Sequence, residues 1–143
     1  MNSNLSIDKQ REIAATPQTV WNVLTNPESI QQWLGVTIHT DWHIGSPITF
    51  SFTWDGKPFE DKGHILEFED QTAFAYDYWS GFSGTEDRPE NYSVIKFRLA
   101  AHNGQTTLQL KHSNFANPAM YEHSDKNWEE TLDVIKKLAE QQE

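Results

Sequence analysis

The sequence predicts an α+β protein in which a curved antiparallel sheet of about six to seven strands packs around one long C-terminal helix. Most segments between residues 36 and 112 alternate apolar and polar side chains, which is the period of a half-buried strand. The C-terminal segment instead places Trp128, Leu132, Ile135 and Leu138 on one helical stripe. A sheet with one face exposed to water needs another element to bury its second face, and only this helix is long enough to do so.

The N-terminal part predicts one strand followed by two short helices. Leu and Ile alternate with polar residues in segment 4–14, which indicates the strand. The helices are expected at 17–24 and 27–34. Each is preceded by a good N-cap residue, Thr16 or Asn26, and each has a proline in its first turn.

Gly35 is placed to end the second helix, and after it the period changes to two. Turn residues such as Asp55-Gly56 separate the alternating runs. A glycine-containing, acidic loop is expected at 80–90. The strands are expected at residues 36–39, 48–54, 59–69, 72–79, 91–100 and 105–112.

Bulky side chains recur at alternate positions of these strands, on faces that we assign inward. Together with two residues of the last helix, the candidate pocket set is Phe50, Phe52, Trp54, His64, Leu66, Phe68, Tyr76, Tyr78, Trp128 and Leu132. Such side chains can line a hollow for an apolar or aromatic ligand, with His64 as an orienting polar group. They can equally form a filled core with a hydrogen-bonded histidine at its edge, and the same two interpretations apply to His112.

Composition restricts the classes of partner. Eleven basic against 21 acidic residues give a net charge of -10, which disfavours nucleic acid and anionic membrane surfaces. No apolar stretch approaches the roughly 18 residues of a membrane span, so we expect no membrane insertion. The chain has no cysteine and no apolar leader segment, and we expect one cytoplasmic domain over residues 1–143, as a monomer or homodimer.

Other chemistry has weak support in the sequence. His39, Asp41 and His43 would share one strand face and could ligate a metal. A polar outer face that runs into a turn explains the same pattern better. No catalytic serine motif or phosphate-binding glycine loop is present, and we assign no metal, no cofactor and no catalytic residue.

Five segments of the chain resemble a known family: Ile13–Pro17, Val20-Trp21, Pro27–Leu34, Asp41–Phe50 and Asn127-Trp128 with Leu132. They match the apolar strand, small-residue turn, helices and glycine turn of START-like (SRPBCC) proteins. Within this superfamily the chain is similar to the C-terminal domain of the activator of the ninety-kilodalton heat-shock protein ATPase. The departures are Asn127, where the family often has glycine, and the lack of a second glycine after Gly45.

The resemblance implies a helix-grip fold with an internal pocket. The function that we expect is binding of a hydrophobic small molecule. One alternative is a co-chaperone-like domain that stimulates a heat-shock chaperone ATPase. The other is a START-like enzyme, such as a cyclase or hydrolase, which needs a titratable residue in the pocket, with His64 as the best candidate.

The helical stripe makes a testable prediction. Replacing Trp128 with alanine should lower the free energy of unfolding by about 3–5 kcal/mol, because large side chains removed from a core leave a cavity. Urea unfolding followed by circular dichroism measures this change. A cost below about 1 kcal/mol would show that the residue does not pack inward.

Overall fold

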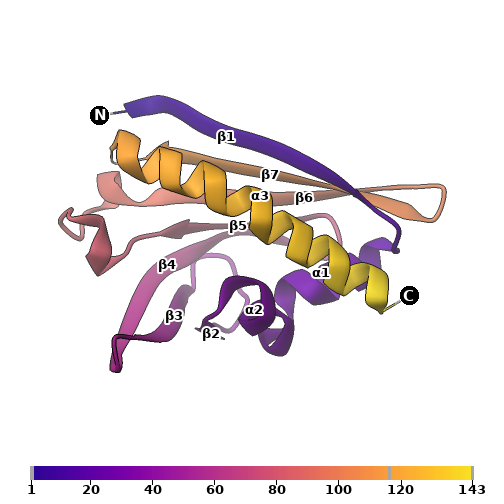
Figure 1. Cartoon of the computed structure of the whole chain (residues 1–143), viewed down its shortest axis with the longest axis horizontal. Helices are drawn as coiled ribbons and strands as arrows, with labels where there is room; N and C mark the ends of the chain where they lie inside the picture. The colour runs from indigo at the N-terminus through magenta and orange to yellow at the C-terminus, as the bar shows by residue number, and fades with distance from the viewer. Residues whose placement is uncertain (1, 116, 143) are drawn as a thin grey trace.

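In the computed structural model, the chain forms a seven-stranded sheet with three α-helices, and the long C-terminal helix lies across it (Figure 1). The structure describes residues 2–115 and 117–142, so residues 1, 116 and 143 of the expected domain lie outside the described residues. The strands are β1 (Asn2–Ile13), β2 (Thr37–His39), β3 (Pro47–Trp54), β4 (Lys57–Glu69), β5 (Ala73–Tyr78), β6 (Ser93–His102) and β7 (Gln105–Phe115). The helices are α1 (Pro17–Thr25), α2 (Pro27–Leu34) and α3 (Pro118–Gln141), with short 3-10 turns η1 (Gly81–Ser83) and η2 (Pro89–Asn91).

The strand order is β1-β7-β6-β5-β4-β3-β2, and every neighbouring pair is antiparallel. The chain order of strand, two short helices, strands and long helix confirms the predicted α+β helix-grip fold. None of the helices in the described part of the chain is long and apolar enough to cross a membrane.

The two short helices begin and end where the sequence predicts, within one residue. The Thr16 side chain accepts a hydrogen bond from the backbone of Thr19, and the Asn26 side chain accepts one from Glu28. Gly35 closes α2 with a φ of 77°, a left-handed conformation that glycine adopts without steric cost. Local capping chemistry therefore fixes this part of the chain, and it brings the end of α2 to the sheet.

Ion pairs hold helix α3 along β1, the edge strand of the sheet. Lys9 pairs with Asp125 and Glu129, and Arg11 pairs with Glu129 and Asp133. Exposed ion pairs contribute little individually, but this network selects one side of the helix. The opposite side buries Trp128, Leu132, Ile135 and Ala139, so the predicted apolar stripe faces the sheet.

A β-bulge in β4 corrects the predicted inward faces of this strand. Ile65 pairs with Tyr76 and Glu67 pairs with Ala75, so Leu66 is the extra residue. One inserted residue exchanges the two faces of everything beyond it, because side chains alternate with a period of two. His64 and Leu66 therefore face outward and are exposed, whereas Phe68 faces the core and is partly buried.

Trp54 also lies outside the interior, although its strand has the predicted phase. Ile48, Phe50 and Phe52 become gradually less buried along β3, and Trp54 at its end is 59% exposed. The β3–β4 hairpin extends past the part of the sheet that the helices cover. The expectation that Trp54 faces inward is therefore wrong, because alternation reports the face of a strand and not the limit of the core.

Candidate ligand-binding site

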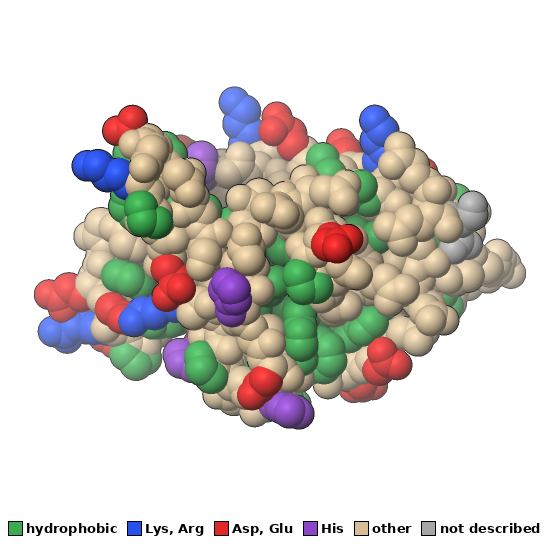
Figure 2. Space-filling model, turned by 90° about the horizontal axis from the view of Figure 1, so that it is seen from below, with side chains coloured by type: hydrophobic (Ala, Val, Ile, Leu, Met, Phe, Trp, Pro, Cys, Tyr) green, Lys and Arg blue, Asp and Glu red, His purple; other side chains and the backbone are tan. Residues whose placement is uncertain are grey.

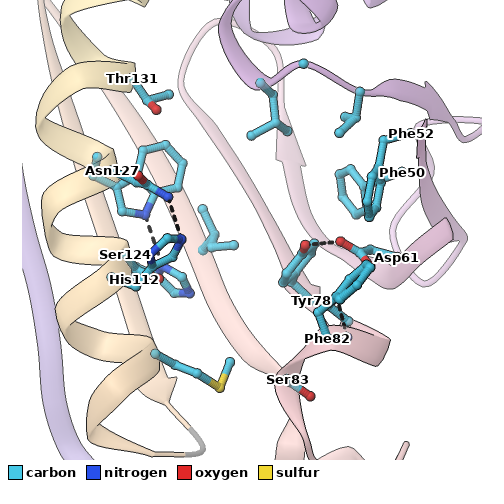
Figure 3. A pocket seen from close by; sticks show the side chains of 18 of the residues that line it. Phe50, Phe52, Asp61, Tyr78, Phe82, Ser83, His112, Ser124, Asn127 and Thr131 are labelled. Carbon is cyan, nitrogen blue, oxygen red and sulfur yellow. Dashed lines mark hydrogen bonds between the residues drawn. The ribbon is translucent and has the colours of Figure 1, made fainter. Parts of the chain in front are cut away.

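A cavity of about 740 Å³ lies between the first half of α3 and strands β3 to β5, with one lining residue each from β6 and β7, and η1 and the end of α2 complete its wall (Figure 3). Its lining residues are Trp33, Leu34, Gly35, Val36, Phe50, Phe52, Thr53, Asp61, Tyr76, Tyr78, Ser80, Phe82, Ser83, Ile95, His112, Met120, His123, Ser124, Asn127, Trp128 and Thr131. On the face shown in Figure 2, hydrophobic side chains are exposed near the middle, with acidic side chains and histidines around them. The cavity has the size and mainly apolar wall typical of small-molecule sites.

Three aromatic rings form the sheet side of the cavity. The Phe50 ring lies 5.4 Å from the Tyr76 ring and 5.4 Å from the Tyr78 ring, measured between centroids. Phe50 belongs to β3, and both tyrosines belong to β5, so the curvature of the sheet brings them together. This wall presents ring faces and edges to a ligand, with a hydroxyl on each tyrosine.

A buried carboxyl lies in this aromatic wall. The Tyr78 hydroxyl donates a hydrogen bond to Asp61 of β4 (Figure 3), and the Ser80 side chain also favours the ionised form of this carboxyl. Burial raises the pKa of Asp61 above its ordinary value, and the bonds from Tyr78 and Ser80 oppose this increase. Burial, followed by the Asp61 charge, raises the pKa of Tyr78, so its hydroxyl stays protonated and donates.

The Tyr76 hydroxyl has no hydrogen-bond partner among residues 2–115 and 117–142. The residue is 3% exposed and burial raises its pKa. No buried side-chain polar atom of the described residues is both fully shielded and unpaired, so this hydroxyl is open to the cavity. It is a polar atom that a ligand can pair with.

The helix side of the cavity is anchored by a chain of buried hydrogen bonds. The Trp128 indole N–H donates to Nδ1 of His112 at 3.0 Å, and Nε2 of His112 lies 2.9 Å from the Ser93 hydroxyl. Because Nδ1 accepts, the neutral ring carries its proton on Nε2 and donates it to Ser93. Burial lowers the pKa of His112 to about 3, so the ring stays neutral at ordinary pH.

Further polar side chains of α3 border the cavity above and below this anchor. Asn127 bonds to Nε2 of His123 at 3.0 Å, and Ser124 and Thr131 also line the space (Figure 3). The part of α3 near its N-terminus is thus polar toward the cavity, while the opposing sheet is aromatic. Such a division suits a ligand that has an apolar body and few polar groups.

The structure brings half of the sequence-predicted pocket set together. Phe50, Phe52, Tyr76, Tyr78 and Trp128 line the cavity. Leu132 is buried in the core and Phe68 packs against the core, both outside the lining, with the Phe68 ring 5.3 Å from that of Trp21. Trp54, His64 and Leu66 are exposed and lie outside it.

The position of His64 removes it as the leading residue of an enzyme site. Its backbone N–H and its ring Nδ1 both bond to Asp77, on the outer side of the sheet. The titratable groups that do line the cavity are Asp61, His112, His123 and the two tyrosines. Sequence reasoning missed Asp61, although its spacing from buried Gly63 and Ile65 is the alternation of an inward face.

The histidine and aspartate pattern near β2 does not form a common strand face. The strand ends at His39, and Trp42 adopts a φ of 65°, so alternation stops before Asp41 and His43. The His43 backbone N–H instead donates to Asp41 in a tight turn. Among the described residues, no group of three or more potential ligands is close enough to hold a metal ion.

Residues 14–140 match the model of a family described as Activator of Hsp90 ATPase homolog 1-like protein. The match covers most of the chain, including every residue that lines the cavity. The chain belongs to this family. No curated protein matches the sequence significantly.

Solved structures share the fold of this family member over nearly the whole chain. ChR145 from Cytophaga hutchinsonii is 34% identical, over 99% of this chain and 98% of that one, with a TM-score of 0.84. The Aha1 dimer from Colwellia psychrerythraea is 21% identical, over 95% and 96%, with a TM-score of 0.73. CalU16 from Micromonospora echinospora is 22% identical, over 94% and 75%, with a TM-score of 0.72. The last two likenesses show the fold alone.

The neutral buried histidine makes this family member sensitive to acid in a defined window. The unfolded state binds a proton at His112 below a pH of about 6.5 and the folded state does not until about 3. Stability is therefore lost as the pH falls through this window, by up to about 1.4 kcal/mol per pH unit. We expect the variant His112→Gln to lack this part of the dependence of unfolding free energy on pH.

Urea unfolding of both proteins between roughly pH 6 and pH 4 tests this expectation. The two slopes are compared, not the absolute stabilities, because the substitution itself disturbs the core. Equal slopes would contradict a neutral, buried His112.

Proposed function

We propose that this protein is a small-molecule-binding module whose ligand, with an apolar or aromatic body, occupies the cavity between α3 and the sheet. The observation that carries the proposal is the cavity itself, with about 740 Å³ of space beside Phe50, Tyr76 and Tyr78. Ligand sites are typically concave, mainly apolar and supplied with a few polar groups of fixed position. Tyr76 and Asp61 provide such groups here.

The polar contacts of the wall support a preformed site. Asp61 is fixed by Tyr78, and Trp128 is fixed by His112 and Ser93. Side chains that already hold their positions lose little conformational entropy when a ligand arrives. The apolar rings and these fixed polar groups therefore favour binding of a ligand over collapse of the space.

A protein-interaction role is a second candidate, favoured by an exposed aromatic cluster of Phe52, Trp54, Phe59 and Phe82. The Phe59 and Phe82 rings lie 4.7 Å apart, and the Trp54 and Phe82 rings 5.5 Å. Trp54 and Phe82 are each more than half exposed, and neighbouring exposed aromatics often mark contact surfaces. A co-chaperone-like contact with a heat-shock chaperone would use this surface. The enzyme alternative remains a prediction without its leading residue.

Binding of the uncharged fluorescent probe N-phenylnaphthylamine tests the proposed function. The unmodified protein should enhance probe emission in a saturable manner. The variant Thr131→Trp inserts a large ring into the cavity and should weaken binding by about tenfold or more, because packed space excludes the probe.

Glu130→Trp is the matched control, because Glu130 is next to Thr131 in the chain but is exposed and lies outside the cavity lining. It should leave the probe affinity unchanged. Equal binding by both variants would place the probe elsewhere on the molecule, and no binding by the unmodified protein would remove the proposed function.

A further inference from the structure

We infer that the cavity selects amphiphilic cations, in which an apolar or aromatic body carries a protonated amine that binds to Asp61. This inference rests on the proposed function and adds the chemical class of the ligand. Three observations support it: the buried carboxyl of Asp61, the lack of lysine and arginine among the described residues of the cavity wall, and the aromatic rings around that carboxyl.

Asp61 is a buried acid without a cationic partner. Its residue exposure is 5%, and no Lys, Arg or His of the described residues forms an ion pair with it. Its partners are the hydroxyls of Tyr78 and Ser80, which favour the ionised carboxylate by hydrogen bonding but supply no charge. Burying a carboxylate without an opposite charge is unfavourable, and a cation bound in the cavity would remove that cost.

The remainder of the wall is suited to a cation and unsuited to an anion. Of the described residues that line the cavity, none is lysine or arginine. The buried ring of His112 already uses both nitrogen atoms in hydrogen bonds. The other histidine of the wall, His123, accepts a hydrogen bond from Asn127 on Nε2, so in this arrangement its ring is neutral. A ligand carboxylate or phosphate would therefore enter a space that contains one like charge and no fixed opposite charge.

Aromatic rings around the carboxyl reinforce this preference. Tyr78 is bonded to Asp61 through its hydroxyl, and its ring is packed at 5.4 Å from Phe50, which also contacts Tyr76 at 5.4 Å. Ring faces attract ammonium groups, and desolvated cation–π contacts are stronger than exposed ones. The open Tyr76 hydroxyl offers an additional acceptor for an ammonium N–H.

The overall charge acts in the same direction at long range. A net charge of -10 attracts cations toward the protein and repels anions before any contact forms. This effect alone does not select a site, because it acts over the whole surface. Asp61 makes the preference local, and a substitution at this position separates the two contributions.

Competition by three naphthalenes of matched shape tests the inference: naphthylmethylamine, naphthylmethanol and naphthoate. Each compound is titrated against N-phenylnaphthylamine bound to the unmodified protein, at constant ionic strength, and its displacement of the probe is measured. We expect the amine to bind about tenfold or more tightly than the alcohol, because hydrogen bonds to charged groups exceed neutral ones by this order, and naphthoate to bind weakest. This ranking requires no variant and so does not depend on the folding of one.

The variant Asp61→Asn should reduce the affinity for the amine by about tenfold and change that for the alcohol by less than about twofold. The amide oxygen can still accept from Tyr78, which preserves the local packing. Asp55→Asn is the control, since it removes the same charge from the exposed β3–β4 turn. It should leave all three affinities unchanged.

Equal binding of the three compounds, or a preference for naphthoate, would overturn the cation inference while the proposed function stands. A loss of amine affinity in Asp55→Asn equal to that in Asp61→Asn would also overturn it, because general attraction would then explain the result. Failure of the probe itself to bind would reject the proposed function and this inference together.

Discussion

The buried hydrogen bond from Trp128 to His112 determines where the long helix lies on the sheet. It joins α3 to β7, and Ser93 extends the same chain of bonds to β6. Each of these groups is buried, so breaking one bond leaves a polar atom unpaired at a cost of about 1–3 kcal/mol. The helix is therefore held over one half of the sheet, with the ion pairs to β1 on its outer side.

The cavity follows from this placement and from simple dimensions. Neighbouring strands are about 4.8 Å apart, and a helix with its side chains is about 10 Å wide. One helix held over β1, β7 and β6 cannot also cover β3 to β5 in a seven-stranded sheet. Helices α1 and α2 cover one end only (Figure 1), and the remaining space is lined by Phe50, Tyr76 and Tyr78.

Local signals in the sequence predicted most of the fold. Short-range chemistry determines the helix ends and the apolar stripe, so both could be predicted. The examples are the caps Thr16 and Asn26, the closing Gly35 and the stripe through Trp128. The inward and outward faces of β4 could not be predicted, because the bulge at Leu66 has no strong residue preference. The bulge also moves every side chain beyond it to the opposite face. His64 was therefore assigned inward, and the inward position of Asp61 was overlooked.

Only part of the candidate site could be predicted, for a related reason. Alternation identified Phe50, Phe52, Tyr76 and Tyr78 because aromatic residues on one face favour the interior. Charged residues are normally exposed, so the alternation that Asp61 shares with Gly63 and Ile65 does not mark it as buried until the strand pairing of β4 is known. The polar residues of α3, such as Asn127, required the placement of the helix over the sheet.

The most direct test of the central claim is a two-dimensional proton–nitrogen spectrum of the tryptophan side chains during titration with naphthylmethylamine. The indole signals of Trp33 and Trp128, which line the cavity, should shift in a saturable way. The signals of Trp21 and Trp79, which lie outside the lining, should stay in place. Shifts confined to Trp21, Trp54 or Trp79 would show that the ligand binds elsewhere, and would contradict the assignment of the space beside α3 as the binding site.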